Sequence, residues 1–202
     1  MKPAVIAISR QFGSGGRLIG AEISKRLGIP CYEKTLFEEA ARHSNIHQLF
    51  FERAEGRNDR IYANTFSCCY SPMDLSLDDR MYIAQAETIR KMAQRGPCII
   101  VGRGANRILE GCGELLRVFI YAERAVRLKR TVDLYGVPEE RAGKLLDSVD
   151  KNRAAYLKFY TGQVFGKAEN YNLCVDSGKL GIENTVQIIE AAWRGLLRRT
   201  EE

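Results

Sequence analysis

The fold of this 202-residue chain is decided by the stretch Ala4-Val5-Ile6-Ala7-Ile8-Ser9-Arg10-Gln11-Phe12-Gly13-Ser14-Gly15-Gly16-Arg17-Leu18-Ile19-Gly20. Its first five residues are apolar, which predicts a strand buried on both faces of a sheet. Beyond the glycines, Ile19, Ile23 and Leu27 recur every four residues and predict a helix that ends at Gly28. Because the backbone N–H groups of a glycine-rich turn and of a helix N-terminus attract anions, this stretch predicts a polyphosphate-binding loop.

The loop departs from the standard P-loop pattern G-x-x-x-x-G-K-S/T at the positions that carry the charge and the hydroxyl. Gly16 stands where the pattern has lysine, Arg17 where it has the magnesium-binding hydroxyl, and Arg10 where it has the first glycine. Arg17 is then the cation expected nearest to a bound triphosphate, with Arg10 as a second. A tight turn without a ligand is the alternative interpretation. The residues predicted to hold the donor phosphates are Arg10, Gly13, Ser14, Gly15, Gly16, Arg17 and Leu18.

The rest of the chain alternates between short apolar runs and amphipathic repeats. The apolar runs predict buried strands at 31–32, 98–101, 118–121 and 173–175. Helical spacing of apolar residues predicts helices within 82–93, 125–135, 138–156 and 182–193. This alternation predicts a single α/β domain around a parallel sheet. Residues 43–75 have no clean period and interrupt the pattern between the second and third strands.

Composition excludes several classes of protein. Hydrophobic residues make up 45% of the chain and charged residues 28%, which is typical of a globular domain. There is neither a secretory signal nor an apolar run of about 20 residues that would span a membrane, so we expect a cytoplasmic protein that does not bind membranes. The six cysteines include no C-x-x-C pair and are expected to be free thiols.

The charge balance favours an anionic partner without naming it. The chain carries 31 basic and 25 acidic residues, a formal net charge of +6. Nucleic acid is a third hypothesis, but no zinc finger, RNA-recognition signature or basic zipper helix supports it. His43 and His47 are four residues apart without a third ligand nearby, so no metal site made by the protein alone is expected.

The segment Ile8-Ser9-Arg10-Gln11-Phe12-Gly13-Ser14-Gly15-Gly16-Arg17 resembles the cytidylate kinase-like family, a divergent branch of the nucleoside monophosphate kinases. Matches at 28–33, 99–105 and 170–173 extend the resemblance over nearly the whole chain. It implies a three-layer P-loop kinase sandwich with a five-stranded parallel sheet of order 2-3-1-4-5 and a helical lid. It also implies that residues 43–75 are an acceptor-binding insertion and that roughly 133–160 include the lid, within one domain of residues 1–202.

The same resemblance implies ATP as donor, Mg²⁺, and a nucleoside monophosphate such as CMP as acceptor. Arg127 and Arg130 resemble the arginine pair that follows the fourth strand, with a solvated basic face as the alternative. Asp150 and Arg153 resemble the Asp-x-x-Arg motif that binds nucleotide, with a helix-surface ion pair as the alternative. The family's arginine four residues before that aspartate is here Leu146, which leaves the acceptor open.

Two further residues end strands at the edge where parallel sheets bind ligands. Arg103 and Glu33 are predicted to contact the substrate, with a structural ion pair and a surface carboxylate as the respective alternatives. Tyr156, Phe159 and Tyr160 are expected to be core or interface residues rather than a base-stacking platform.

The sequence therefore predicts ATP-dependent phosphoryl transfer to a small acceptor. A nucleotide- or phosphoester-binding protein with little or no kinase activity is the alternative, because the lysine and the hydroxyl are missing. The residues predicted to act in catalysis are Arg17, Arg127, Arg130 and Arg153. The last three are expected to point into an open cleft until both substrates are bound.

Overall fold

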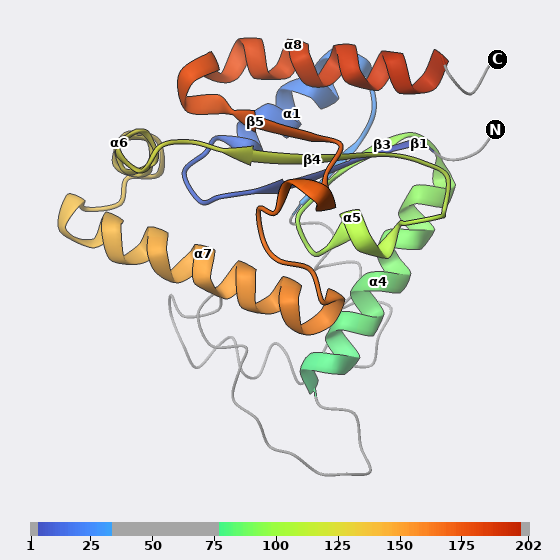
Figure 1. Ribbon diagram of the computed structural model, residues 1–202, viewed down its shortest axis with the longest axis horizontal. Coiled ribbons are helices and arrows are strands. Elements are labelled where there is room, and N and C mark those ends of the chain that lie inside the picture. Colours follow the sequence, from blue (N-terminus) through green and yellow to red (C-terminus); the bar gives the residue numbers. More distant parts are fainter. Residues whose placement is uncertain (1–3, 34–76, 199–202) are drawn as a thin grey trace.

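The computed structural model describes residues 4–33 and 77–198. They form a five-stranded sheet in the order β2-β3-β1-β4-β5, and every pair of neighbouring strands is parallel. The predicted fold class and strand order are thereby confirmed (Figure 1). The strands are β1 (Ala4–Arg10), β2 (Cys31–Tyr32), β3 (Cys98–Val101), β4 (Glu114–Tyr121) and β5 (Leu173–Asp176). The predicted acceptor insertion and the two histidines lie outside the described residues.

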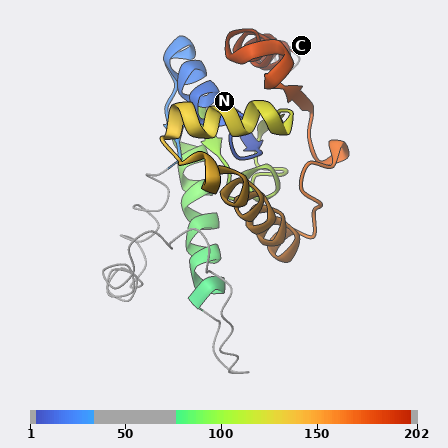
Figure 2. The same ribbon diagram turned by 90° about the vertical axis from the view of Figure 1, so that its left-hand side faces the viewer.

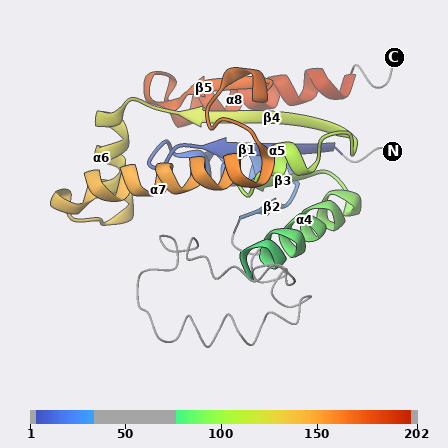
Figure 3. The ribbon, with the colours of Figure 1, turned by 60° about the horizontal axis from the view of Figure 1, so that its bottom comes forward.

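Helices cover both faces of this sheet. On one face lie α1 (Gly16–Leu27) and α8 (Ser177–Arg198), and on the other α4 (Leu77–Arg95), α5 (Ala105–Ile108) and α7 (Glu139–Thr161) (Figures 1 and 3). A further α-helix, α6 (Arg124–Tyr135), lies across the end of the sheet toward which the strands point, and Figure 2 looks onto that end. The carboxyl edge of the sheet is therefore enclosed by α6 and by the start of α7.

The two-sided core explains why the first strand is a continuous apolar run. Ile6 and Ile8 belong to the cluster packed against α1 and α8, whereas Val5 and Ala7 belong to the cluster on the α4 and α5 side. Successive side chains of a strand point to opposite faces, so both kinds of position must be apolar when both faces are covered.

The fourth strand is longer than predicted. It begins at Glu114 and pairs with β1 from Ala4 onward, although polar residues interrupt its apolar pattern. Arg117 is one of them, and its backbone N–H and its Nε donate to Asn172 Oδ1 at 2.9 and 3.2 Å. Backbone pairing therefore extends the strand beyond the part that the sequence pattern marks.

Three tyrosines join α4 to α7. The rings of Tyr82 and Tyr160 are stacked with their centroids 4.2 Å apart, and the ring of Tyr156 lies 5.0 Å from that of Tyr160. These rings face one another, which agrees with the expectation that Tyr156 and Tyr160 are interface residues, whereas Phe159, expected to be one as well, is 67% exposed. Among the described cysteines, Cys31, Cys98, Cys112 and Cys174 are free thiols. No helix in residues 4–33 and 77–198 is both long and apolar enough to cross a bilayer.

Candidate phosphate-binding and phosphoryl-transfer site

The glycine-rich loop connects the end of β1 directly to the first turn of α1. Gly13 and Gly15 have φ angles of 74° and 79°, in the left-handed region that favours glycine. A Cβ at Gly13 would lie 2.6 Å from the carbonyl oxygen of Arg127, so the loop also packs too tightly against α6 for a side chain there. The first helical hydrogen bond runs from Ile19 N–H to Gly15 O at 3.0 Å. The N–H groups of Gly16 to Leu18 precede it and have no acceptor within the helix.

The carbonyl groups of the loop are held from outside by three arginines. Arg153 Nη1 donates to Arg10 O at 3.0 Å, Arg127 Nη1 to Phe12 O at 3.2 Å, and Arg130 Nη1 to Ser14 O at 3.1 Å. These are three of the four arginines predicted from sequence to act in catalysis, and the fold brings all three to one loop. They do not point into an open cleft, because carbonyl groups at this crowded edge require donors.

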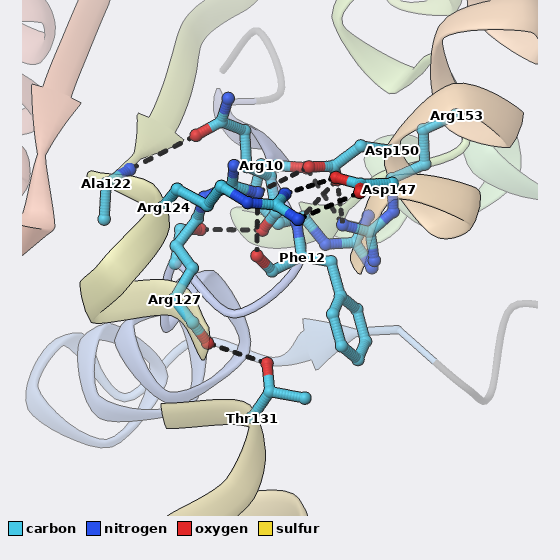
Figure 4. A network of polar contacts seen from close by, with 11 residues as sticks. Arg10, Phe12, Ala122, Arg124, Arg127, Thr131, Asp147, Asp150 and Arg153 are labelled. Carbon is cyan, nitrogen blue, oxygen red and sulfur yellow. Dashed lines mark hydrogen bonds and ion pairs between the residues drawn. The ribbon is translucent and has the colours of Figure 1, made fainter. Parts of the chain in front are cut away.

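Asp150 joins α7 to the loop and to α6. Its Oδ1 accepts the backbone N–H of Phe12 at 2.7 Å, and its Oδ2 accepts Arg127 Nη1 at 2.6 Å (Figure 4). Arg153 lies farther away, with Nη1 3.8 Å from Asp150 Oδ1, and its guanidinium lies 5.8 Å from the centre of the Phe12 ring. The helix-surface ion pair considered from sequence is thus present, but the shorter contacts of Asp150 cross to other elements. Arg124 and Asp147 form a second ion pair between α6 and α7 (Figure 4).

Glu33 binds two cations of the loop at once. Its Oε1 lies 3.2 Å from Arg10 Nη2 and its Oε2 lies 2.9 Å from Arg17 Nε. The two arginines differ in burial, since the side chain of Arg17 is 55% exposed and that of Arg10 is 17% exposed. Glu33 therefore lies in an ion-pair cluster at the carboxyl edge and is not an isolated surface carboxylate.

Arg103 follows β3 in a strained turn. Gly102, Arg103 and Gly104 have φ angles of 88°, 59° and 69°, and a left-handed arginine is uncommon outside functional or over-determined sites. Burial, together with the charges of nearby Arg10 and Arg103, lowers the pKa of Arg153 to about 9. Three guanidinium groups thus share this edge, and an anion placed among them would relieve their repulsion.

Sequence reasoning missed Ser177 and Gln11. The buried hydroxyl of Ser177 donates to Ser14 O at 2.5 Å and accepts from Arg130 Nη1 at 3.1 Å. Gln11 Oε1 accepts the N–H of Ala122 at 3.3 Å, which ties the loop to the end of β4. Ser177 begins α8 directly after β5, so its place at the carboxyl end of a strand was the one available signal.

The predicted loop residues divide into two groups. Ser14 is fully buried and its hydroxyl donates to Gln11 O at 2.8 Å, so it shapes the loop from behind. Leu18 is 43% exposed, and Arg17 is the other exposed residue of the first helical turn. A phosphate would meet the backbone N–H groups of this turn rather than the Ser14 hydroxyl.

Comparison with solved structures finds the same architecture in an uncharacterized protein and in two small-molecule kinases. An uncharacterized protein from Eubacterium ventriosum is 26% identical, with a TM-score of 0.72 over 95% of this chain and 98% of that one. Shikimate kinase from Bacteroides thetaiotaomicron is 15% identical, with a TM-score of 0.53 over 95% of this chain and 98% of that one. A gluconokinase from Sinorhizobium meliloti is 20% identical, with a TM-score of 0.51 over 99% of this chain and 95% of that one. The two kinases show the fold alone.

Among curated proteins, none is a significant match to this chain. The family model described as the cytidylate kinase-like family matches residues 5–179, which include the glycine-rich loop, Glu33, Arg103 and the whole of α6 and α7. The expected resemblance is thereby confirmed over most of the chain, and membership supports phosphoryl transfer as the general activity. The chain belongs to the cytidylate kinase-like family.

Proposed function

We propose that this protein transfers a phosphoryl group from ATP to a small acceptor, and that the acceptor is a nucleoside monophosphate such as CMP. Family membership supports phosphoryl transfer in general, and the choice of acceptor rests on the resemblance of the motifs. The single observation that carries the proposal is the hydrogen bonding of the loop between β1 and α1. Its carbonyl groups are bound by arginines of α6 and α7, while the first-turn N–H groups of α1 stay available for an anion.

The reaction needs alignment and positive charge more than covalent help. In it, the bond between the γ-phosphorus and its bridging oxygen breaks with the electron pair going to ADP, and an acceptor oxygen forms the new bond to phosphorus. The loop and Arg17 would hold the donor phosphates. Arg127, Arg130 and Arg153 contact carbonyl groups of the loop, and each would bind charge that develops on the transferring group.

A bound Mg²⁺ would add positive charge to the donor phosphates. Residues 4–33 and 77–198 contain no group of three His, Cys, Asp or Glu side chains arranged to hold a metal ion. Mg²⁺ commonly uses one or two carboxylates together with substrate phosphates and water. Glu33 is a carboxylate beside the loop, but each of its oxygens is paired with an arginine, so it would have to release Arg10 or Arg17 to hold a metal brought by the nucleotide.

The acceptor would bind where Glu33, Arg103, Asp150 and Arg153 converge on the carboxyl edge of β1, β2 and β3. An acidic acceptor fits this edge because Arg103 and Arg10 both repel Arg153. Leu146, at the position where cytidylate kinases carry an arginine, is 1% exposed and packs in the interior. Recognition of the acceptor must therefore differ from theirs at this position.

A second candidate function is nucleotide binding with little or no turnover. The observation that favours it is the absence of a lysine at Gly16 and of a hydroxyl at Arg17. Arg17 is in an ion pair, and Arg130 and Arg153 donate hydrogen bonds to carbonyl groups of the loop. Such fixed arginines are expected of a binding site that does not need to reorganise.

One experiment separates the two functions. The full chain is incubated with ATP, Mg²⁺ and a panel of nucleoside monophosphates, shikimate and gluconate, and both ADP release and the mass of the phosphorylated acceptor are followed. Phosphorylation of one nucleoside monophosphate well above the others supports the proposal. Thermal stabilisation by ATP without phosphorylated product for any acceptor would favour the binding function. Where arginine variants of the site are assayed in the same way, Lys129→Ala is the matched control for the loss of one positive charge. Lys129 lies on α6, is paired with Asp133, and its side chain is 79% exposed.

A further inference from the structure

Two glycines far apart in the sequence accommodate the side chain of Arg10. A Cβ at Gly16 would lie 2.8 Å from Arg10 Cβ and 2.9 Å from its Cγ. A Cβ at Gly102 would lie 2.2 Å from Arg10 Nη1. The aliphatic stem of Arg10 therefore lies against the backbone of Gly16, and its guanidinium lies against the backbone of Gly102.

This packing explains the missing lysine in physical terms. Any side chain at Gly16 would collide with the stem of Arg10, since real Cβ atoms do not approach other atoms that closely. The P-loop pattern has glycine at the position of Arg10 and lysine at the position of Gly16. This chain has the two exchanged. Its cation begins on the last residue of β1 and the small residue opens α1.

The position of the guanidinium suits a reacting phosphate. Arg10 ends β1, Gly102 follows β3, and Glu33 follows β2, so Arg10 lies at the carboxyl edge of three adjacent strands. Ligands of open parallel sheets bind at this edge. The predicted donor loop begins at Arg10, and the predicted acceptor residue Glu33 lies 3.2 Å from the Arg10 guanidinium.

Arg10 is better placed than Arg17 to act on a group shared by both substrates. Arg17 projects from the first turn of α1, is 55% exposed and contacts the other oxygen of Glu33. The side chain of Arg10 is 17% exposed, and its charge is balanced chiefly by a carboxylate that it shares with Arg17. Interactions with charge are stronger in a water-poor position than at the surface.

We propose that Arg10 is the catalytic cation that takes the place of the P-loop lysine, and that Gly16 is the partner this exchange requires. The inference rests on the proposed phosphoryl transfer and assigns one residue within it. Arg10 forms no bond to phosphorus and moves no proton. Its guanidinium neutralises negative charge on the transferring group while the bond to ADP breaks and the bond to the acceptor forms.

The test restores the P-loop pattern at both positions, with glycine in place of Arg10 and lysine in place of Gly16. Arg10→Ala is expected to lower kcat with the best acceptor by about 10²- to 10³-fold, as for loss of a preorganised charged donor. Gly16→Lys alone is expected to be inactive, because the lysine collides with Arg10. In the double variant Arg10→Gly with Gly16→Lys, the lysine has room, and kcat is expected to recover by at least tenfold over Arg10→Gly. A residue with a merely structural role would not be rescued from the opposite side of the loop.

Folding and binding are measured beside the rate. Circular dichroism melts show whether each variant folds, and ATP affinity is measured by titration calorimetry. Arg10→Lys, which keeps the charge, tests the role without relying on the double variant and is expected to retain more activity than Arg10→Ala. An Arg10→Ala protein with the turnover of the wild type would overturn the assignment, as would a folded double variant no better than Arg10→Gly. If the wild type phosphorylates no acceptor, the proposed function fails. The role of Arg10 is then judged by ATP affinity alone, and an Arg10→Ala protein that binds ATP as tightly as the wild type would overturn it.

Discussion

The carboxylate of Asp150, midway along α7, accepts the backbone N–H of Phe12 in the glycine-rich loop at 2.7 Å. The same carboxylate binds Arg127, which donates in turn to the carbonyl of Phe12 at 3.2 Å. A helix predicted to belong to a lid therefore holds the N–H of one loop residue directly, and holds the arginine of α6 that binds the carbonyl of the same residue. Loop geometry and the position of α7 are coupled through this residue.

Asp150→Ala is predicted to destabilise the fold and to impair the loop together. Arg127 is 8% exposed, and breaking a buried ion pair by removing one partner costs about 3 to 5 kcal/mol. The free energy of unfolding from urea denaturation is expected to fall toward that range. Asp150→Asn retains an acceptor for the Phe12 N–H and is expected to lose less.

The control for this prediction is the double variant Asp150→Ala with Arg127→Met. Removing both charges avoids an unpaired buried cation, so the double variant should be more stable than Asp150→Ala alone. The single variant Arg127→Met completes the comparison. If the losses of unfolding free energy in Asp150→Ala and Arg127→Met add up to the loss in the double variant, the ion pair does not couple α6 to α7.

Local features of the site could be predicted from sequence, and distant contacts could not. The strand, the glycines and the first helix are contiguous, so pattern and spacing were enough to place the loop. The contact between Asp150 and Phe12 spans 138 residues, and no periodicity encodes it. Similarly, the spacing of Arg127 and Arg130 indicated one helix face but not that both would bind loop carbonyl groups.

Gly15→Val is predicted to abolish ATP binding in a folded protein. Gly15 has a φ of 79°, which valine disfavours strongly, and the backbone of this residue begins the anion-binding turn. A Cβ there would also lie 2.5 Å from Cδ1 of Ile182, so a clash with α8 is a competing cause. Gly15→Val with Ile182→Ala separates the causes, because it removes the clash but not the backbone strain. Recovery of ATP affinity in the double variant, measured by calorimetry, would contradict a direct role of the loop backbone.

Cysteine reactivity is predicted to follow burial. Burial raises the pKa of Cys31 and of Cys98 to about 11, so at pH 8 only about one thiol in a thousand is the reactive thiolate. Cys112 and Cys174 are exposed, but burial raises the pKa of Cys174, so among the described cysteines Cys112 is expected to be alkylated first. Raising the pH toward 11 should increase alkylation of Cys31 and Cys98, provided the protein remains folded. Peptide mass mapping after brief iodoacetamide treatment checks the order, and labelling of Cys98 before Cys112 in the native protein would contradict it.

Alanine at Arg130 or Arg153 is predicted to lower turnover more than it weakens ATP binding. Both guanidinium groups lie within hydrogen-bonding distance of loop carbonyl groups, and burial lowers the pKa of each, so their positive charge lacks full compensation before an anion arrives. Charge that builds up on the transferring phosphoryl group would supply that compensation mainly in the transition state. An interaction of this kind changes kcat more than ground-state affinity.

Arg127→Ala is expected to behave differently from these two, because its ion pair with Asp150 is largely buried and its loss also destabilises the fold. Steady-state kinetics and ATP titration of the three alanine variants are therefore compared with urea denaturation of each. Lys129→Ala, on the exposed side of α6, controls for the loss of one positive charge and is expected to keep the activity of the wild type. Equal activity in Arg130→Ala, Arg153→Ala and Lys129→Ala would mean that these arginines only support the loop carbonyl groups. A selective loss of kcat in the first two would instead place them on the reacting phosphate, since support of the loop alone would weaken ATP binding to the same extent.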